Sequence, residues 1–184
     1  MRSSTISLLF LVGLPTSAIA DMPSKPSSSS AAKASSLTVT SSAFSANGAI
    51  PAEYTCDGSE TSPPLSWSGV PSTAKSIAIL VEDPDAPKGT FTHWLVTDIP
   101  TTTSSLDKGA SPPAGAMAAK NDKGNTGYAG PCPPTGQHHY HFRVYALDKT
   151  LGKITTRAEL QSAIKGHVLA QGELVGTYQK QASH

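Results

Sequence analysis

Short apolar stretches separated by clusters of proline, glycine and serine run through most of this chain of 184 residues. The clearest stretches are residues 75–82, 92–99 and 139–147, and each is about as long as one β-strand. Between them lie turn-forming clusters, such as residues 62–64 and 88–89, that end strands and lead into loops. The pattern predicts a mainly β domain, a sandwich with long loops.

Periodicity within these stretches predicts which faces are buried. Residues 75–82 are apolar almost throughout, as expected for a central strand that is covered on both faces. Residues 139–147 alternate instead. One face would carry Tyr140, Phe142, Val144 and Ala146, and the other would carry His139, His141, Arg143 and Tyr145. Residues 37–44 and 174–178 are expected to form further strands.

One helix is indicated before the last strand. Thr156 and Glu159 have the spacing of a capping box, which satisfies backbone N–H groups at a helix N-terminus. Leu160 and Ile164 lie one helical turn apart, and Gly166 follows where a helix commonly ends. The domain is therefore expected to have few helices, at its periphery.

The N-terminal residues 1–20 have the features of a signal peptide, with Arg2 followed by an apolar stretch and small residues before a cleavage point. The apolar stretch is shorter than the about 20 residues that a transmembrane helix needs. An uncleaved hydrophobic arm is the alternative. Residues 21–36 are rich in Ser, Pro and Ala and are predicted to form a disordered tether, followed by a domain over 37–184. We therefore expect a secreted or periplasmic protein with no integral membrane segment after processing.

Charge limits the possible partners. The formal net charge is +1, and without Arg2 the 13 remaining basic residues equal the 13 acidic ones. A neutral chain without a basic stripe argues against nucleic acid as a partner and against electrostatic docking on a membrane. A ligand would therefore be selected by a local pocket and not by a long-range electrostatic field. The sequence leaves open whether the chain forms a homodimer.

The chain contains two cysteines, Cys56 and Cys132. In an exported protein an even pair indicates a disulfide, which here would close a loop of roughly 75 residues and stabilise the fold by about 4 kcal/mol. Two buried free thiols are the alternative. Metal binding by the pair is not expected, because neither cysteine has the spacing of a zinc site.

Three segments hold most of the unusual polar chemistry: residues 83–87 (Asp-Pro-Asp-Ala-Pro), residues 92–94 (Thr-His-Trp) and the glycine- and proline-rich residues 127–140. Each lies where an apolar stretch meets a turn, which is where a rigid scaffold places binding groups. Asp83 and Asp85 would point the same way from an extended chain. A carboxylate there could fix the ring of His93, leaving its other nitrogen for a ligand.

Each segment also has a plainer interpretation. The two aspartates could form Asx-turns, the histidine of the second segment could be a packed core residue, and the third segment could be an exposed loop. What favours binding is that glycine backbone in the third segment lets an anion approach main-chain N–H groups. His138 and Tyr140 follow with the same parity, so both could face one cavity, whereas His139 would face the surface.

In their order along residues 38–178, these motifs resemble the phosphatidylethanolamine-binding protein (PEBP) family, in its bacterial-type, Raf-kinase-inhibitor-like branch. The resemblance implies a Greek-key β-sandwich with a few peripheral helices and a small anion pocket at one end. It also implies that the pocket uses Asp83, Asp85, His93, Gly130, His138 and Tyr140, beside which we place Pro131 of the same loop. The chain lacks the longer inserts and C-terminal helix of the mammalian branch, so kinase inhibition is not expected.

These residues suit a non-catalytic protein that binds a phosphorylated or zwitterionic head group, such as phosphoethanolamine or a phospholipid head group. No cofactor is expected. One alternative is an exported inhibitor or interaction protein that engages a partner such as a protease. Another is a hydrolase with Asp/His acid–base chemistry, in which a metal site of His93, His138 and Asp85 is conceivable. No nucleophile motif such as Gly-x-Ser-x-Gly supports the hydrolase.

Overall fold

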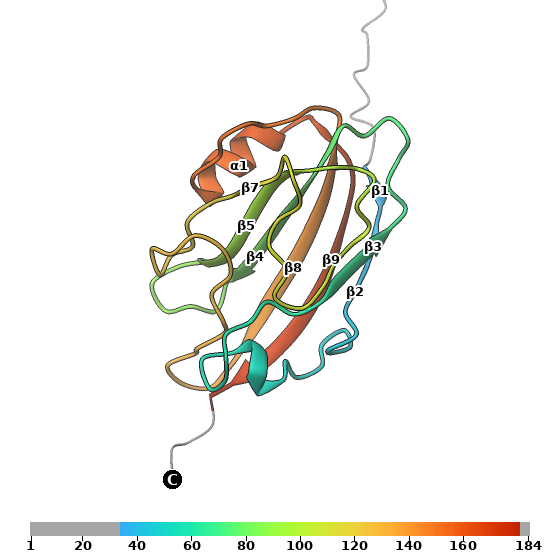
Figure 1. Cartoon of the computed structure of the whole chain (residues 1–184). Coiled ribbons are helices and arrows are strands. Elements are labelled where there is room, and N and C mark those ends of the chain that lie inside the picture. The colour runs from blue at the N-terminus through green and yellow to red at the C-terminus, as the bar shows by residue number, and fades with distance from the viewer. Residues whose placement is uncertain (1–33, 181–184) are drawn as a thin grey trace, which may run out of the picture. The chain divides into compact units, whose positions relative to one another are not determined.

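Residues 34–180 are described in the computed structural model and form two β-sheets and one α-helix (Figure 1). The larger sheet has six strands, in the order β1 (Ser35–Ser36), β9 (Val168–Gln179), β8 (Gln137–Leu147), β4 (Ser76–Asp83), β5 (Phe91–Ile99) and β7 (Met117–Ala118). The smaller sheet has the order β2 (Thr38–Thr40), β3 (Leu65–Ser68) and β6 (Ser105–Leu106). A short 3-10 helix, η1 (Ala52–Tyr54), and the helix α1 (Arg157–Ile164) complete the domain. The predicted signal peptide lies outside the described residues.

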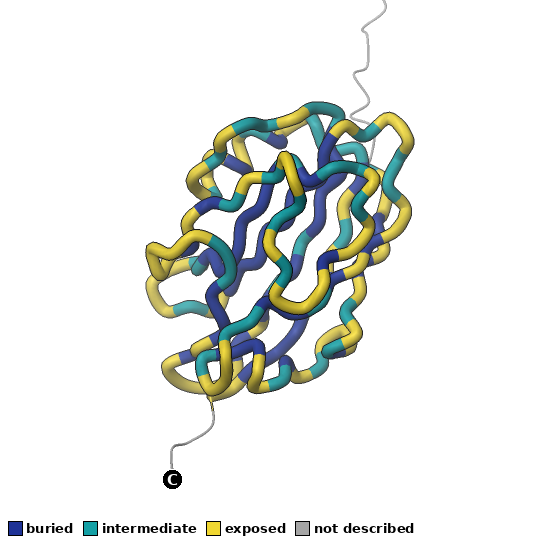
Figure 2. Tube along the Cα trace, viewed as in Figure 1, coloured by how far each residue is buried: buried dark blue, intermediate teal, exposed yellow. Residues whose placement is uncertain are grey.

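The two sheets enclose the main hydrophobic core. This core combines Val39 of β2 and Trp67 of β3 with Val81, Trp94 and Phe142 of the larger sheet. A second cluster lies on the opposite face of the larger sheet, where α1 packs its two buried residues, Leu160 and Ile164. The central strands are accordingly buried along most of their length (Figure 2). The predicted β-sandwich is confirmed, and residues 34–180 contain one α-helix and one 3-10 helix where a few helices were expected.

The central strands match their predicted positions. β4 is buried at all eight residues because β5 and β8 pair with it on both sides and both of its faces are covered. In β8 the predicted inner face lies in the main core, whereas Tyr145 of the other face packs in the cluster below α1. Thr156 caps α1 by accepting a hydrogen bond from the Glu159 backbone N–H.

The two strands at one side of the larger sheet, β1 and β9, differ from the expectation. β9 begins at Val168, well before the predicted residue 174, because it pairs with β8 along its length. Its glycines interrupt the apolar pattern for a packing reason, since a Cβ on Gly172 would lie 2.3 Å from the carbonyl oxygen of Leu37. Ser35 and Ser36, assigned to the tether by composition, instead pair with β9 in parallel. Backbone pairing of this kind leaves no mark on the side-chain pattern.

Strand ends of the larger sheet position the site. Asp83, the last residue of β4, is paired with Phe91, the first residue of β5. β8 begins at the same end, because its residue His141 is opposite Glu82. The turn between β4 and β5 therefore meets the start of β8, which is distant in sequence, at one end of the sheet.

Candidate functional site

A cavity of about 280 Å³ lies at this end of the sheet. Its walls come from the β4–β5 turn, the start of β5, the loop before β8 and the first residues of β8. Four of the residues predicted to bind a ligand line it, namely Asp83, His93, Gly130 and His138. The other predicted residues, Asp85, Pro131 and Tyr140, are not among its lining residues.

Asp83 organises one side of the cavity. One carboxylate oxygen accepts the backbone N–H of Asp85 at 2.8 Å, which forms the Asx-turn considered from the sequence. The other carboxylate oxygen lies 2.7 Å from Nδ1 of His138, and both side chains are buried. The carboxylate therefore fixes the ring of His138, not that of His93 as expected, and it leaves Nε2 of His138 for a ligand.

His93 is held by backbone instead. Its Nδ1 lies 2.8 Å from the carbonyl oxygen of Ala129, so Nδ1 carries a proton and donates it. Burial lowers the pKa of His93 below its ordinary value, more than the Ala129 carbonyl and Asp83 raise it. The ring is consequently neutral at pH 7, and its Nε2 is an acceptor.

Tyr140 forms a wall behind both imidazoles. Its ring lies edge-on to His93, with 5.2 Å between ring centroids, and stacks on His138 at 6.5 Å. The Tyr140 hydroxyl is buried and has no hydrogen-bond partner among the described residues. Burial also raises the pKa of this phenol, so the hydroxyl keeps its proton. Tyr140 thus contributes an aromatic ring beside the two histidines, and its hydroxyl is a buried donor.

Asp85 lies on the outside of the turn. It accepts hydrogen bonds from the backbone N–H and from Nδ1 of His139, each at 2.8 Å, and both side chains are substantially exposed. The hydrogen bonds from His139 lower the pKa of Asp85. The expected common direction of Asp83 and Asp85 fails because the Asx-turn ends the extended chain at Asp83. His139 is at the surface, as expected.

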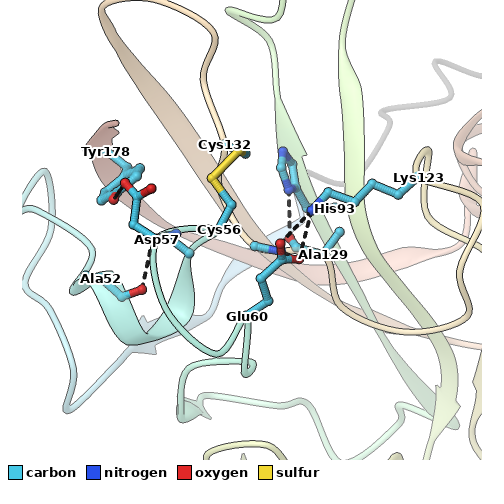
Figure 3. The surroundings of a disulfide bond; sticks show 11 residues. Ala52, Cys56, Asp57, Glu60, His93, Lys123, Ala129, Cys132 and Tyr178 are labelled. Carbon is cyan, nitrogen blue, oxygen red and sulfur yellow. Dashed lines mark hydrogen bonds and ion pairs between the residues drawn. A yellow bond between two sulfur atoms is a disulfide. The ribbon is translucent and has the colours of Figure 1, made fainter. Parts of the chain in front are cut away.

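The disulfide between Cys56 and Cys132 is present and joins the segment after η1 to the loop before β8 (Figure 3). Cys132 lines the cavity, and the backbone N–H of Cys56 donates to the carbonyl oxygen of Pro131 at 3.0 Å. The bond therefore fixes one wall of the cavity to the body of the domain.

Sequence reasoning missed Glu60 and Lys123. Lys123 lines the cavity and forms an ion pair with Glu60 at 2.8 Å, and Glu60 also accepts the backbone N–H of Gly130 at 3.3 Å (Figure 3). Both residues lie in loops far apart in the sequence, and no motif marks either of them.

A family model described as phosphatidylethanolamine-binding protein matches residues 40–179. The chain belongs to the PEBP family. A PEBP homologue from Chlamydia trachomatis is 41% identical in sequence and superposes with a TM-score of 0.75 over 80% of this chain and 100% of its own. YbcL of Escherichia coli, described as a member of the mammalian PEBP family, is 33% identical, with a TM-score of 0.74 and the same coverage. A UPF0098 protein of Methanothermobacter thermautotrophicus is 44% identical over 75% of this chain and 95% of the relative.

Two further observations bear on this PEBP domain. Across residues 34–180, no group of three or more His, Cys, Asp or Glu is arranged to hold a metal ion, so His93, His138 and Asp85 do not form the site considered from the sequence. Within the same range, no helix has the length and apolarity required to cross a bilayer.

Stability of the PEBP domain should depend on pH through His93. The lowered pKa means that the unfolded state binds more protons below about pH 6.5, so the free energy of unfolding falls as pH decreases through this range. We expect His93→Gln to show a smaller fall between pH 7.5 and 5, as measured by urea denaturation. Parallel curves for the two proteins would show that His93 is not the residue responsible.

Proposed function

We propose that this PEBP domain is a non-catalytic binding protein that holds a phosphorylated or zwitterionic head group, such as phosphoethanolamine, in the cavity. The observation that carries the proposal is the convergence of His93 and His138, from different strands, on one cavity that Gly130 also lines. Each histidine has its Nδ1 engaged within the protein, so Nε2 of each is the nitrogen available to a ligand.

The cavity suits both halves of a small zwitterion. Lys88 and Lys123 supply positive charge for a phosphate, and the imidazoles accept a phosphate hydroxyl when neutral or donate when protonated. The carboxylate of Asp83 and the ring of Phe91 suit an ammonium group. Pockets for drug-sized ligands have volumes of about 300–1,000 Å³, so a cavity of about 280 Å³ favours a head group over a molecule with its acyl chains.

The residues that line the cavity also favour binding over catalysis. They include no serine or threonine, and the cysteine among them is Cys132, which is held in the disulfide. A covalent mechanism needs an activated nucleophile beside a base, and the described cavity walls offer no serine, threonine or free cysteine for that role. We also propose that the protein is exported, since the disulfide is compatible with an oxidising compartment.

Calorimetric titration with phosphoethanolamine tests the proposal. His138→Asn should weaken binding at least tenfold, because it removes a hydrogen bond to a charged ligand, worth about 1.5–3 kcal/mol. His141→Asn is a matched control. Like His138, His141 lies on β8 and has its Nδ1 next to a carboxylate, that of Glu173 at 2.8 Å, but His141 does not line the cavity. Equal affinities for the two variants would contradict the proposed site.

A further inference from the structure

A carboxylate of the protein already occupies two of the donors that an anion would use. Both oxygens of Glu60 contact Nζ of Lys123, at 2.9 and 2.8 Å, and one of them accepts the backbone N–H of Gly130 at 3.3 Å. Lys123 and Gly130 both line the cavity. The Glu60 carboxylate thus contacts Lys123 (Figure 3) and the N–H of Gly130 as a ligand oxyanion would.

Glu60 is charged and held in an uncommon backbone conformation. Its hydrogen bond to Lys123 lowers its pKa, more than burial raises it, so the carboxylate is ionised at neutral pH. Its φ of +52° lies in the left-handed region, which residues other than glycine rarely adopt. The charge of His93, when its ring is protonated, lowers the pKa of Glu60 further.

The contacts of Glu60 are weak enough to be exchanged. The ion pair is about one third exposed on both sides, and exposed pairs contribute little to stability. The distance of 3.3 Å from Gly130 is longer than usual for an N–H···O hydrogen bond. Glu60 also borders a neighbouring groove of about 350 Å³ beside Trp94 and Tyr128, so a displaced side chain has space outside the cavity.

We propose that Glu60 is a resident counter-anion of the cavity, and that a ligand oxyanion binds by replacing its carboxylate at Lys123 and at the N–H of Gly130. The inference rests on the proposed function and deepens it by naming two residues that set affinity. Lys123 then contacts the ligand directly, whereas Glu60 lowers affinity for any oxyanion by competing with it. Phosphate esters with two negative charges are the class best able to displace it, because they interact more strongly with the ammonium of Lys123.

Titration of wild type, Glu60→Gln and Lys123→Met with phosphoethanolamine and with inorganic phosphate, at pH 7 and low salt, tests the exchange. Glu60→Gln should bind both probes at least threefold more tightly, and the gain should shrink in 0.5 M salt because screening weakens the competition. Lys123→Met should weaken binding in the wild-type and Glu60→Gln backgrounds alike. Glu53→Gln is the matched control, since Glu53 pairs with Lys108 at 2.6 Å and Lys108, unlike Lys123, does not line the cavity; the affinity of this variant should equal that of wild type.

The two proposals fail in different ways. If wild type binds either probe and a folded Glu60→Gln variant binds that probe no more tightly, the exchange is overturned but the proposed function is not. Absence of binding by both proteins overturns the proposed function and the exchange with it. Binding by Glu60→Gln but not by wild type supports both. If Glu60→Gln is too unstable to titrate, Glu60→Asp keeps the charge with a shorter side chain, and unchanged affinity in that variant also overturns the exchange.

Discussion

Replacing both Cys56 and Cys132 by serine is expected to lower the free energy of unfolding by about 4 kcal/mol. The disulfide joins residues 76 positions apart, so its loss releases a long loop in the unfolded chain and raises the entropy of that state. Because native domains are stable by only about 5–15 kcal/mol, the variant should lose a large share of its stability. Urea denaturation of wild type and variant under non-reducing conditions measures the difference.

The same variant should also bind phosphoethanolamine more weakly. Cys132 lines the cavity, and without the bond its loop is held to the segment after η1 by weaker contacts, such as the hydrogen bond from Cys56 N–H to Pro131. Wild type in reducing agent is the control, since it removes the bond without changing the sequence and should behave like the variant. A variant that unfolds at the same urea concentration as oxidised wild type would show that the bond does not stabilise the fold.

Gly130→Ala should disrupt the cavity wall at a position where a side chain has no space. A Cβ there would lie 2.9 Å from both the Cα of Thr55 and the carbonyl oxygen of Tyr54. These are backbone atoms, so no rotation of a side chain relieves the overlap and the loop must move. Overpacking of this kind costs about 1–3 kcal/mol. We expect a loss of that size in urea denaturation and at least a tenfold loss of affinity for phosphoethanolamine in calorimetry.

Gly127→Ala is the control for that loop. A Cβ at Gly127 meets nothing within 4 Å, but the φ of +99° makes any side chain strained there. Alanine at Gly127 should therefore lower stability by about 1–2 kcal/mol while leaving affinity near that of wild type. If both variants bind equally well, the wall formed by Gly130 is not part of the ligand site.

The central strands and the capped helix were predictable because each has a characteristic pattern within its own residues. β4 is apolar because both of its faces are covered, and β8 alternates because its two faces meet different surroundings. Thr156 and Glu159 mark the start of α1 through contacts made within one turn of chain. The short strand β1 and the early start of β9 had no such mark, because they depend on backbone pairing with distant segments.

For the candidate site, the sequence determined which residue types stand at the strand ends and in the loop before β8, and this was sufficient to predict that Asp83, His93, Gly130 and His138 share one cavity. Only the tertiary structure decided how they are paired. Asp83 orients His138, and the carbonyl of Ala129 orients His93. Asp85 turns outward to His139, because the Asx-turn bends a segment that was assumed to be extended when side-chain directions were predicted. Glu60 and Lys123 reach the site from loops 63 residues apart, and such contacts arise only when the packed sheets bring those loops together.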